Sequence, residues 1–96
     1  MRKYDVTFIV RPDLEEANIT KVAEEMKNVL TSNGAKILEE KGMEQRELAY
    51  EIKKFKTGYY FFYKIETNTS DAINEFNRVS RISENVIRHL IIKVED

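Results

Sequence analysis

The chain has 96 residues, a length that predicts one domain over residues 1–96. Its 16 basic and 17 acidic residues give a net charge of −1, which does not by itself indicate a polyanionic partner. The absence of cysteine excludes disulfide bonds, a thiolate nucleophile and a cysteine metal site. No apolar run approaches the roughly 20 residues of a membrane span, and Asp5 interrupts any signal-peptide pattern. We therefore expect a soluble, cytoplasmic protein.

The first elements are a strand and a helix. Residues 3–10 alternate between apolar and polar side chains, which predicts a half-buried strand that ends before Pro12. Asp13, followed by an acidic residue three positions later, has the form of a helix N-cap. Apolar residues then recur at helical spacing and predict a helix from about Leu14 to Ser32, which Asn33 and Gly34 stop.

The middle of the chain reads as two strands around a basic loop. The first strand begins at residues 35–41, bends near Gly42 and continues to residues 48–52. The loop spans Lys53–Gly58, and the next strand runs from about Gly58 to Thr67.

This later strand holds five consecutive aromatic residues, 59–63. Successive side chains of a strand point to opposite faces. Tyr59, Phe61 and Tyr63 therefore share one face, and Tyr60 and Phe62 share the other. Only one face can line the core, so we expect something to cover the second.

The last elements are a second helix and a final strand. Ser70 is placed to cap a helix whose apolar residues 73, 76 and 79 share one face and which ends near Arg81. Val86–Val94 is a strand with two mixed faces, so the sequence leaves open which face meets the helices. The order strand, helix, strand, strand, helix, strand predicts an α+β, ferredoxin-like fold: a four-stranded antiparallel sheet with both helices on one face. The other face would be free for nucleic acid, protein or another sheet.

The sequence offers no catalytic constellation. His89 is the only histidine, and no cysteine or activated serine stands beside it as a partner. Histidine clusters that bind metals are excluded by count, and the three glycines are too dispersed to form a phosphate-binding loop. We expect no enzyme activity, no cofactor and no metal.

Binding is the better supported class of function. Basic residues gather near the first strand, in the loop and near the end of the chain, which is typical either of a local RNA-binding patch or of ordinary solvated charges. Aromatic residues on an open sheet can stack on bases. The third strand lacks the glycine-rich consensus of the RNA-recognition motif, so for Tyr60 and Phe62 we favour packing against a protein partner.

Five stretches together resemble the bacterial small-subunit ribosomal protein S6 family over essentially the whole chain. They are MRKYDVTFIVRPDL, LTSNGAKI, RELAYEI, TGYYFFYKIE and RISENVIRHLIIK. The resemblance implies the ferredoxin-like fold and a component of the 30S subunit in the cytoplasm. It also implies a heterodimer with ribosomal protein S18 that binds the central domain of the small-subunit (16S) ribosomal RNA.

The chain departs from the family in one segment. Before the leucine-alanine-tyrosine motif the family commonly carries a tryptophan, a glycine and a basic cluster, whereas residues 43–47 keep a positive charge only at Arg46. We expect phosphate contacts there to be weakened. The sequence ends at Asp96, without the longer tail of some relatives, so contacts of that tail are not carried over.

The resemblance suggests specific binding residues. Those predicted to bind RNA are Arg2, Tyr4, Arg88 and Lys93, followed by Arg46 and Lys54. Those predicted to meet the protein partner are Leu48, Tyr50, Tyr60 and Phe62. Three alternatives stay open: an internal salt bridge for Arg88, a ring at the core edge for Tyr4, and ordinary strand packing for residues 48–50.

Two functions of other classes are the rivals. One is a small-molecule-sensing regulatory domain that homodimerises through its sheet. The other is a small hydrolase or isomerase on the same fold, for which no site can be assembled from these residues.

Overall fold

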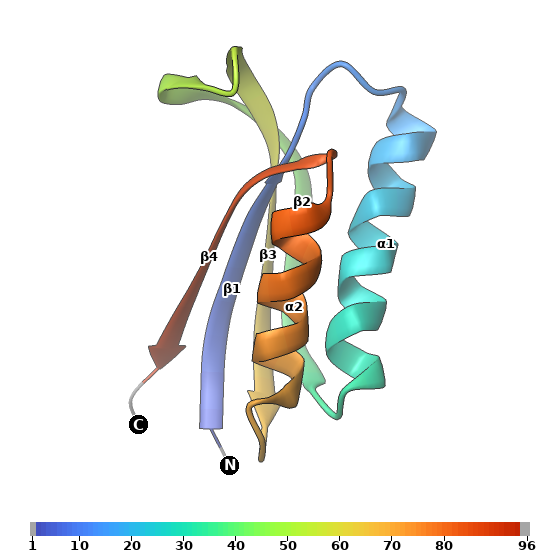
Figure 1. Ribbon diagram of the computed structural model, residues 1–96, viewed down its shortest axis with the longest axis vertical. Coiled ribbons are helices and arrows are strands. Elements are labelled where there is room, and N and C mark those ends of the chain that lie inside the picture. Colours follow the sequence, from blue (N-terminus) through green and yellow to red (C-terminus); the bar gives the residue numbers. More distant parts are fainter. Residues whose placement is uncertain (1, 95–96) are drawn as a thin grey trace.

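The computed structural model describes residues 2–94 and confirms the predicted fold (Figure 1). Four strands form one antiparallel sheet in the order β2-β3-β1-β4, and both helices lie on one of its faces. We call the face away from the helices the open face. The elements are β1 (Arg2–Val10), α1 (Glu16–Ser32), β2 (Lys36–Ile52), β3 (Phe55–Thr67), α2 (Asp71–Ile82) and β4 (Val86–Val94).

Phe8 of β1 lies at the centre of the core. Its ring is fully buried and stacks on Phe61 of β3, with centroids 5.2 Å apart and planes 12° apart. It also meets Phe76 of α2 edge-on at 5.8 Å. Aromatic pairs in these geometries add stability beyond the apolar area that they bury. One side chain thus joins the two central strands to the second helix.

The aromatic run of β3 alternates as predicted. Phe61 and Tyr63 are buried under the helices, whereas Tyr60 and Phe62 are only half-buried on the open face. The Tyr63 hydroxyl donates a hydrogen bond of 3.2 Å to the carbonyl of Ala23 in α1. Burial, with the nearby charges of Glu40 and Glu24, raises the pKa of Tyr63 to about 12, so this donor keeps its proton.

The predicted N-cap of the first helix is wrong. The cap position is Glu15, whose side chain makes no capping hydrogen bond, and α1 begins at Glu16 rather than near Leu14. The Asp13 carboxylate instead binds the Arg11 guanidinium in a bidentate pair of 2.7 and 2.9 Å. A planar guanidinium offers a carboxylate two charge-assisted bonds, whereas a cap offers it a single backbone donor.

One smaller expectation about the second helix also needs correction. Ser70 occupies the cap position, but its side chain makes no capping hydrogen bond, and the Asp71 amide donates to the Thr69 hydroxyl at 3.3 Å. The helix ends at Ile82, which agrees with the predicted end near Arg81.

The predicted basic loop is much shorter than six residues. Ile52 of β2 pairs with Phe55 of β3, so only Lys53 and Lys54 form the turn. Both have positive φ values, 48° and 72°. Two-residue hairpins need this left-handed backbone because it matches the twist of the strands, and Asn-Gly is the usual sequence for it. The sheet register therefore overrides the local preference of the two lysines.

The ends of β2 and β3 form a long hairpin arm, residues 44–58. The pairing of β2 with β3 shifts register three times along its length, between residues 37 and 39, 41 and 44, and 47 and 52. Such irregularities bend a strand pair. The arm curls away from the helices, toward the open face (Figure 1).

A register shift between Ile9 and Val10 settles how β4 faces the helices. Val10 pairs with Val86 and Ile9 with Arg88, so Ile87 is the additional residue on β4. Beyond this bulge His89 and Ile91 lie opposite Phe8 and Val6, on the helix side. Arg88, Leu90 and Ile92 therefore point to the open face.

Gly58 permits β1 and the hairpin arm to approach closely. A Cβ atom at this position would overlap Cγ2 of Ile9 and lie 3.4 Å from the Val10 carbonyl oxygen. We expect Gly58→Ala to lower the free energy of unfolding by about 1–3 kcal/mol, the typical effect of overpacking. In an Ile9→Ala background the same substitution should have a smaller effect, because the overlapping methyl group is gone.

Urea unfolding of the four proteins of this double-mutant cycle measures that coupling. Lys56→Ala, at an exposed position of the same strand, is the control and should stay within ~0.5 kcal/mol of the parent chain. Equal effects of Gly58→Ala in both backgrounds would show that the two residues do not compete for space.

His89 is a structural residue on the helix side of β4. Its Nε2 lies 2.9 Å from Oδ1 of Asn77, and its ring meets Phe76 edge-on with centroids 6.2 Å apart. Burial, assisted by the positive charge of Arg81, lowers its pKa from the ordinary value of 6.5. The neutral ring, with Nε2–H donating to Asn77, is thus the form that the fold favours.

This environment predicts a pH-dependent stability. Because the folded pKa is lower than the unfolded one, the unfolded chain binds more protons between the two values, so stability falls as the pH drops below 6.5. Urea unfolding at about pH 7 and pH 5.5 should show this loss in the parent chain. His89→Gln should lose less, since His89 is the only histidine. The same loss in both proteins would assign it to carboxylates instead.

Candidate protein and nucleic-acid interface

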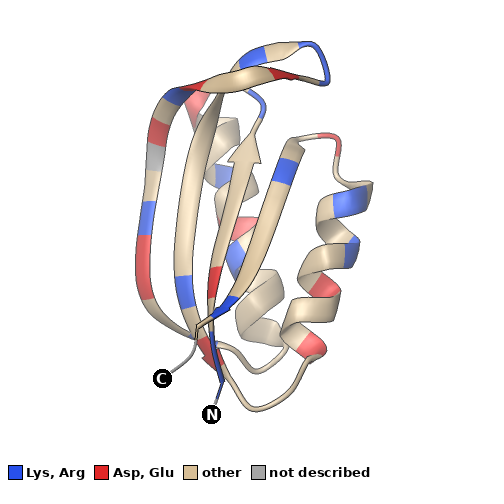
Figure 2. Ribbon diagram, turned by 90° about the vertical axis from the view of Figure 1, so that its left-hand side faces the viewer, with Lys and Arg blue, Asp and Glu red and all other residues tan. Residues whose placement is uncertain are grey.

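Apolar side chains of the open face lie in three cross-strand rows over β3, β1 and β4, together with Thr7 and the charged Asp5, Lys64 and Arg88. Charged residues instead alternate along β2 at one edge of the sheet (Figure 2). From β3 through β1 to β4 the rows are Tyr60, Ile9 and Arg88; Phe62, Thr7 and Leu90; and Lys64, Asp5 and Ile92. Side chains directly opposite in antiparallel strands lie on the same face and contact one another.

Several of these apolar side chains are unusually exposed. Leu90 and Ile92 are each 54% exposed, and Tyr50 on the hairpin arm is 68% exposed. Single exposed apolar residues are ordinary, but a contiguous group is typical of an interaction site. We call the group formed by the exposed Leu90 and Ile92, the half-buried Tyr60 and Phe62 and the buried Ile9 between them the apolar patch.

A hollow of about 230 Å³ lies between the hairpin arm and the sheet. Leu48, Ala49, Tyr50 and Ile52 of the arm form one wall, and Thr7, Ile9, Tyr60, Arg88, His89 and Leu90 of the sheet form the rest. Ligand pockets usually measure roughly 300–1,000 Å³. The hollow is therefore better suited to one or two inserted side chains of a partner than to a small-molecule ligand.

Three of the four predicted protein-partner residues line this hollow: Leu48, Tyr50 and Tyr60. The fourth, Phe62, lies one row along the sheet beside a second hollow of about 320 Å³, which Tyr60 also lines. The fold thus brings the four residues to one surface, although 10 or more positions separate the first pair from the second.

Arg46 occupies part of this surface. Its guanidinium carbon lies 5.4 Å from the centroid of the Tyr60 ring, and its Nη2 lies 2.9 Å from Oε2 of Glu44. Cation–π contact and an exposed ion pair hold the side chain over the ring. One face of Tyr60 is therefore covered, and the charge of Arg46 is shared with a carboxylate.

The predicted RNA-binding residues fall into separate places. Arg2, Tyr4 and Lys93 gather at one end of the sheet, where Tyr4 pairs with Lys93. Arg88 on β4 lies beside Ile9 of β1. At the rise of a β-strand, Ile9 is roughly 23 Å from Arg2 along β1. Lys54 lies in the turn at the tip of the hairpin arm.

Most of these cations are available to bind an anion. Arg2, Lys54, Arg88 and Lys93 are all exposed. Among residues 2–94, no ion pair is found for any of the four. The internal salt bridge considered for Arg88 is therefore not formed within the described chain. Tyr4 differs from them, because its ring packs against the hydrophobic core.

Two features of this surface were not predicted from the sequence. One is the orientation of Leu90 and Ile92, which depends on the bulge at Ile87. The other is Arg11, whose guanidinium lies 5.1 Å from the centroid of the Phe55 ring at the tip of the hairpin arm. The proline that ends β1 was visible, but no local signal placed Phe55 against the residue before it.

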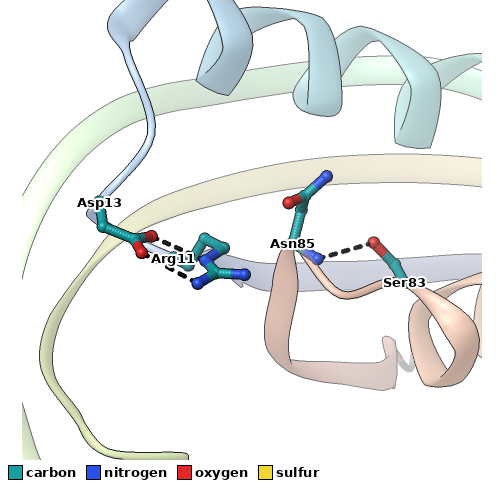
Figure 3. A network of polar contacts seen from close by, with 4 residues as sticks. All are labelled: Arg11, Asp13, Ser83 and Asn85. Atoms are coloured by element: carbon teal, nitrogen blue, oxygen red, sulfur yellow. Dashed lines mark hydrogen bonds and ion pairs between the residues drawn. The ribbon is translucent and has the colours of Figure 1, made fainter.

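Arg11 joins three segments. Its guanidinium binds Asp13 (Figure 3). Its backbone N–H donates to the Asn85 carbonyl at 2.9 Å, and its charged group lies over Phe55. In the neighbouring turn, Asn85 N–H donates to the Ser83 hydroxyl at 3.2 Å. The bidentate hydrogen bond raises the pKa of Arg11 and lowers that of Asp13, so both stay charged. These contacts help to hold the arm over the open face.

Within residues 2–94, no group of three or more histidine, aspartate or glutamate side chains is placed to hold a metal ion. Neither α1 nor α2, the two helices in this range, is long and apolar enough to cross a membrane.

Comparison with known proteins gives two findings. A family model described as ribosomal protein S6 matches residues 3–93. The chain is also similar to the crystal structure of the 30S ribosomal protein S6 from Thermotoga maritima, with 26% sequence identity and a TM-score of 0.92. That match covers 97% of this chain and 87% of the other.

Proposed function

The chain belongs to the ribosomal protein S6 family, and from this premise we propose that it is a structural constituent of the small ribosomal subunit. In this role it binds 16S ribosomal RNA together with ribosomal protein S18, in the cytoplasm on the ribosome. A structural role without a catalytic step is consistent with the family. The structural match to a 30S ribosomal protein supports the same role.

One observation supports the proposal that a protein partner docks on the open face. The apolar patch continues into a hollow beneath the hairpin arm. Removing apolar surface from water is the main driving force of protein association. The hollow would hold a side chain of the partner at the centre of the interface, where most binding energy usually lies. Leu48, Tyr50, Tyr60 and Phe62 would contact S18 there.

The exposed cations support a share in RNA binding. Phosphates are within reach of Arg2 and Lys93 at one end of the sheet and of Arg88 beside Ile9. Contacts to phosphates position a protein on RNA but do not depend on the RNA sequence. Few such cations and a net charge of −1 make the isolated chain a weak RNA ligand. Binding would tighten when the partner adds its own phosphate contacts.

Arg46 and Lys54 are second-rank RNA contacts in this proposal. Arg46 already shares its charge with Glu44 and covers Tyr60. Its place beside the apolar patch suits the edge of the protein interface as well as a phosphate. Lys54, at the tip of the hairpin arm, would touch RNA only if the arm extends past the partner.

We expect tight RNA binding only from the heterodimer. Filter-binding titration of the 16S central domain at fixed salt should give weak binding by the chain alone and tight binding with S18 present. Sizing chromatography is the control: the chain should run as a monomer that shifts only with S18. Equal RNA affinity with and without S18 would contradict the shared mechanism, and a stable homodimer would favour the small-molecule-sensing alternative.

Arg88→Glu tests the first-rank RNA contact. We expect RNA affinity of the heterodimer to fall roughly tenfold or more, and the slope of log affinity against log salt to become shallower by about 1, because one phosphate contact is lost. Arg78→Glu makes the same charge change on α2, on the other side of the sheet, and should leave both quantities near those of the parent.

Arg88 also lines the hollow, so S18 binding must be measured separately for each variant by calorimetry. The RNA titration is then carried out at S18 concentrations that saturate the chain. If Arg88→Glu and Arg78→Glu give the same RNA affinity and salt slope, Arg88 is not an RNA contact.

A further inference from the structure

We propose that Asp5 selects the protein partner by binding a lysine or arginine side chain that the partner places on the open face. This inference rests on the proposed docking of a partner on that face. It goes beyond it by naming the residue that sets the charge of the group bound there.

The Asp5 carboxylate holds an unusual position. Its Oδ1 atom is buried and accepts no hydrogen bond from residues 2–94, although the residue lies on β1 in the middle of the open face. Most buried polar atoms in folded proteins have a hydrogen-bond partner, and an orphaned acceptor needs an explanation. A donor supplied by a bound protein is such an explanation.

Lys64 is the one cation placed opposite Asp5, but it does not satisfy it. Its position on β3 lies between Asp5 on β1 and Glu39 on β2. Among residues 2–94, no ion pair joins Lys64 to either carboxylate. The row Glu39, Lys64, Asp5 and Ile92 holds two negative charges and one positive charge. Glu39 pairs with Lys41, so Asp5 is the carboxylate of this row for which no ion pair is found among residues 2–94.

The apolar residues around Asp5 make partner binding depend on the charge that the partner places there. Ile92 lies directly opposite Asp5 on β4, and Leu90 and Phe62 belong to the adjoining row. A partner that covers the patch removes water from around the carboxylate. An unpaired charge is then strongly unfavourable, whereas a charge paired with a hydrogen-bonding cation is tolerated or favourable. Partners without a cation at this place are rejected, which is how many interfaces gain specificity.

The positive charge of Arg88 lies at the other end of the patch from Asp5, so a partner can bind this surface in only one orientation. Arg88 lies at the row of Ile9, four residues from Asp5 along β1, which is roughly 13 Å at the rise of a strand. The hollow beneath the hairpin arm begins at Thr7 and Ile9. The matching partner segment thus carries its cation about 7–13 Å from the apolar side chain that enters the hollow.

The experiment compares three variants of the full chain in titrations with ribosomal protein S18. Asp5→Asn removes the charge but keeps the shape. Glu39→Gln makes the same charge change in the same row, at an exposed carboxylate that already pairs with Lys41. Leu90→Asp places a charge in the apolar patch and tests the docking itself. The melting temperature of each isolated variant is measured alongside.

We expect Asp5→Asn to weaken S18 binding roughly 30-fold or more, the effect of removing one member of a buried charge pair. Glu39→Gln should stay within about twofold, and the melting temperature of Asp5→Asn should not fall. A single S18 lysine or arginine changed to methionine should weaken binding to the parent chain but not weaken it further in the Asp5→Asn background.

Three results would overturn the proposal in distinguishable ways. If Leu90→Asp abolishes binding while Asp5→Asn has no effect, the docking surface is right and the role of Asp5 is wrong. If neither variant weakens binding, S18 does not dock on the open face. If Asp5→Asn lowers the melting temperature, and Lys64→Met lowers it equally, Asp5 serves an internal ion pair with Lys64 instead.

Discussion

The contact of Phe8 with Phe61, on which it stacks, and with Phe76, which it meets edge-on, is the one on which the rest of the molecule depends. It commits one set of alternating side chains in β1 and β3 to the helices. The opposite set, which includes Ile9, Tyr60 and Phe62, must then face away from them. Both helices described, α1 and α2, lie on the other face, so no helix covers this second set. The candidate binding surface is therefore a direct result of how the core is built.

The hairpin arm turns that uncovered face into a shaped site. A flat sheet offers a partner only a plane, but the curled arm adds a wall and encloses a hollow. The arm is held at its tip by Arg11 over Phe55 and near its junction with the sheet by the close approach of Gly58 to Ile9. A site whose walls are fixed before binding loses less entropy when a partner arrives.

Much of the fold could be predicted from the sequence, because its signals are periodic. The alternation of residues 3–10 and 59–63 and the helical spacing after Pro12 each determine an element and the face it buries. The orientation of β4 could not be predicted, since one extra residue at Ile87 reverses the alternation and no local pattern marks it. The pairing of Asp13 with Arg11 instead of the helix amides was equally hidden, because both uses of the carboxylate fit the sequence.

The candidate site likewise has a part that could be predicted from the sequence and a part that could not. The aromatic residues Tyr60 and Phe62 could be assigned to the uncovered face from the strand period alone. The unsatisfied Asp5 could not be recognised, because its significance comes from its neighbours on two other strands, Lys64 and Ile92, which lie about 60 and 90 residues away. Whether Arg46 is free or occupied likewise depends on the arm that brings it over Tyr60.

The charged edge of the sheet has a consequence for the life of the chain before assembly. β2 is an outer strand of 17 residues, and such strands expose backbone groups that can pair with another molecule and start aggregation. Here its exposed positions carry closely spaced acidic and basic side chains, such as Glu39, Lys41, Glu44 and Arg46. Its repeated register shifts also keep the edge from lying flat. A newly made chain can therefore leave the apolar patch exposed without joining copies of itself edge to edge.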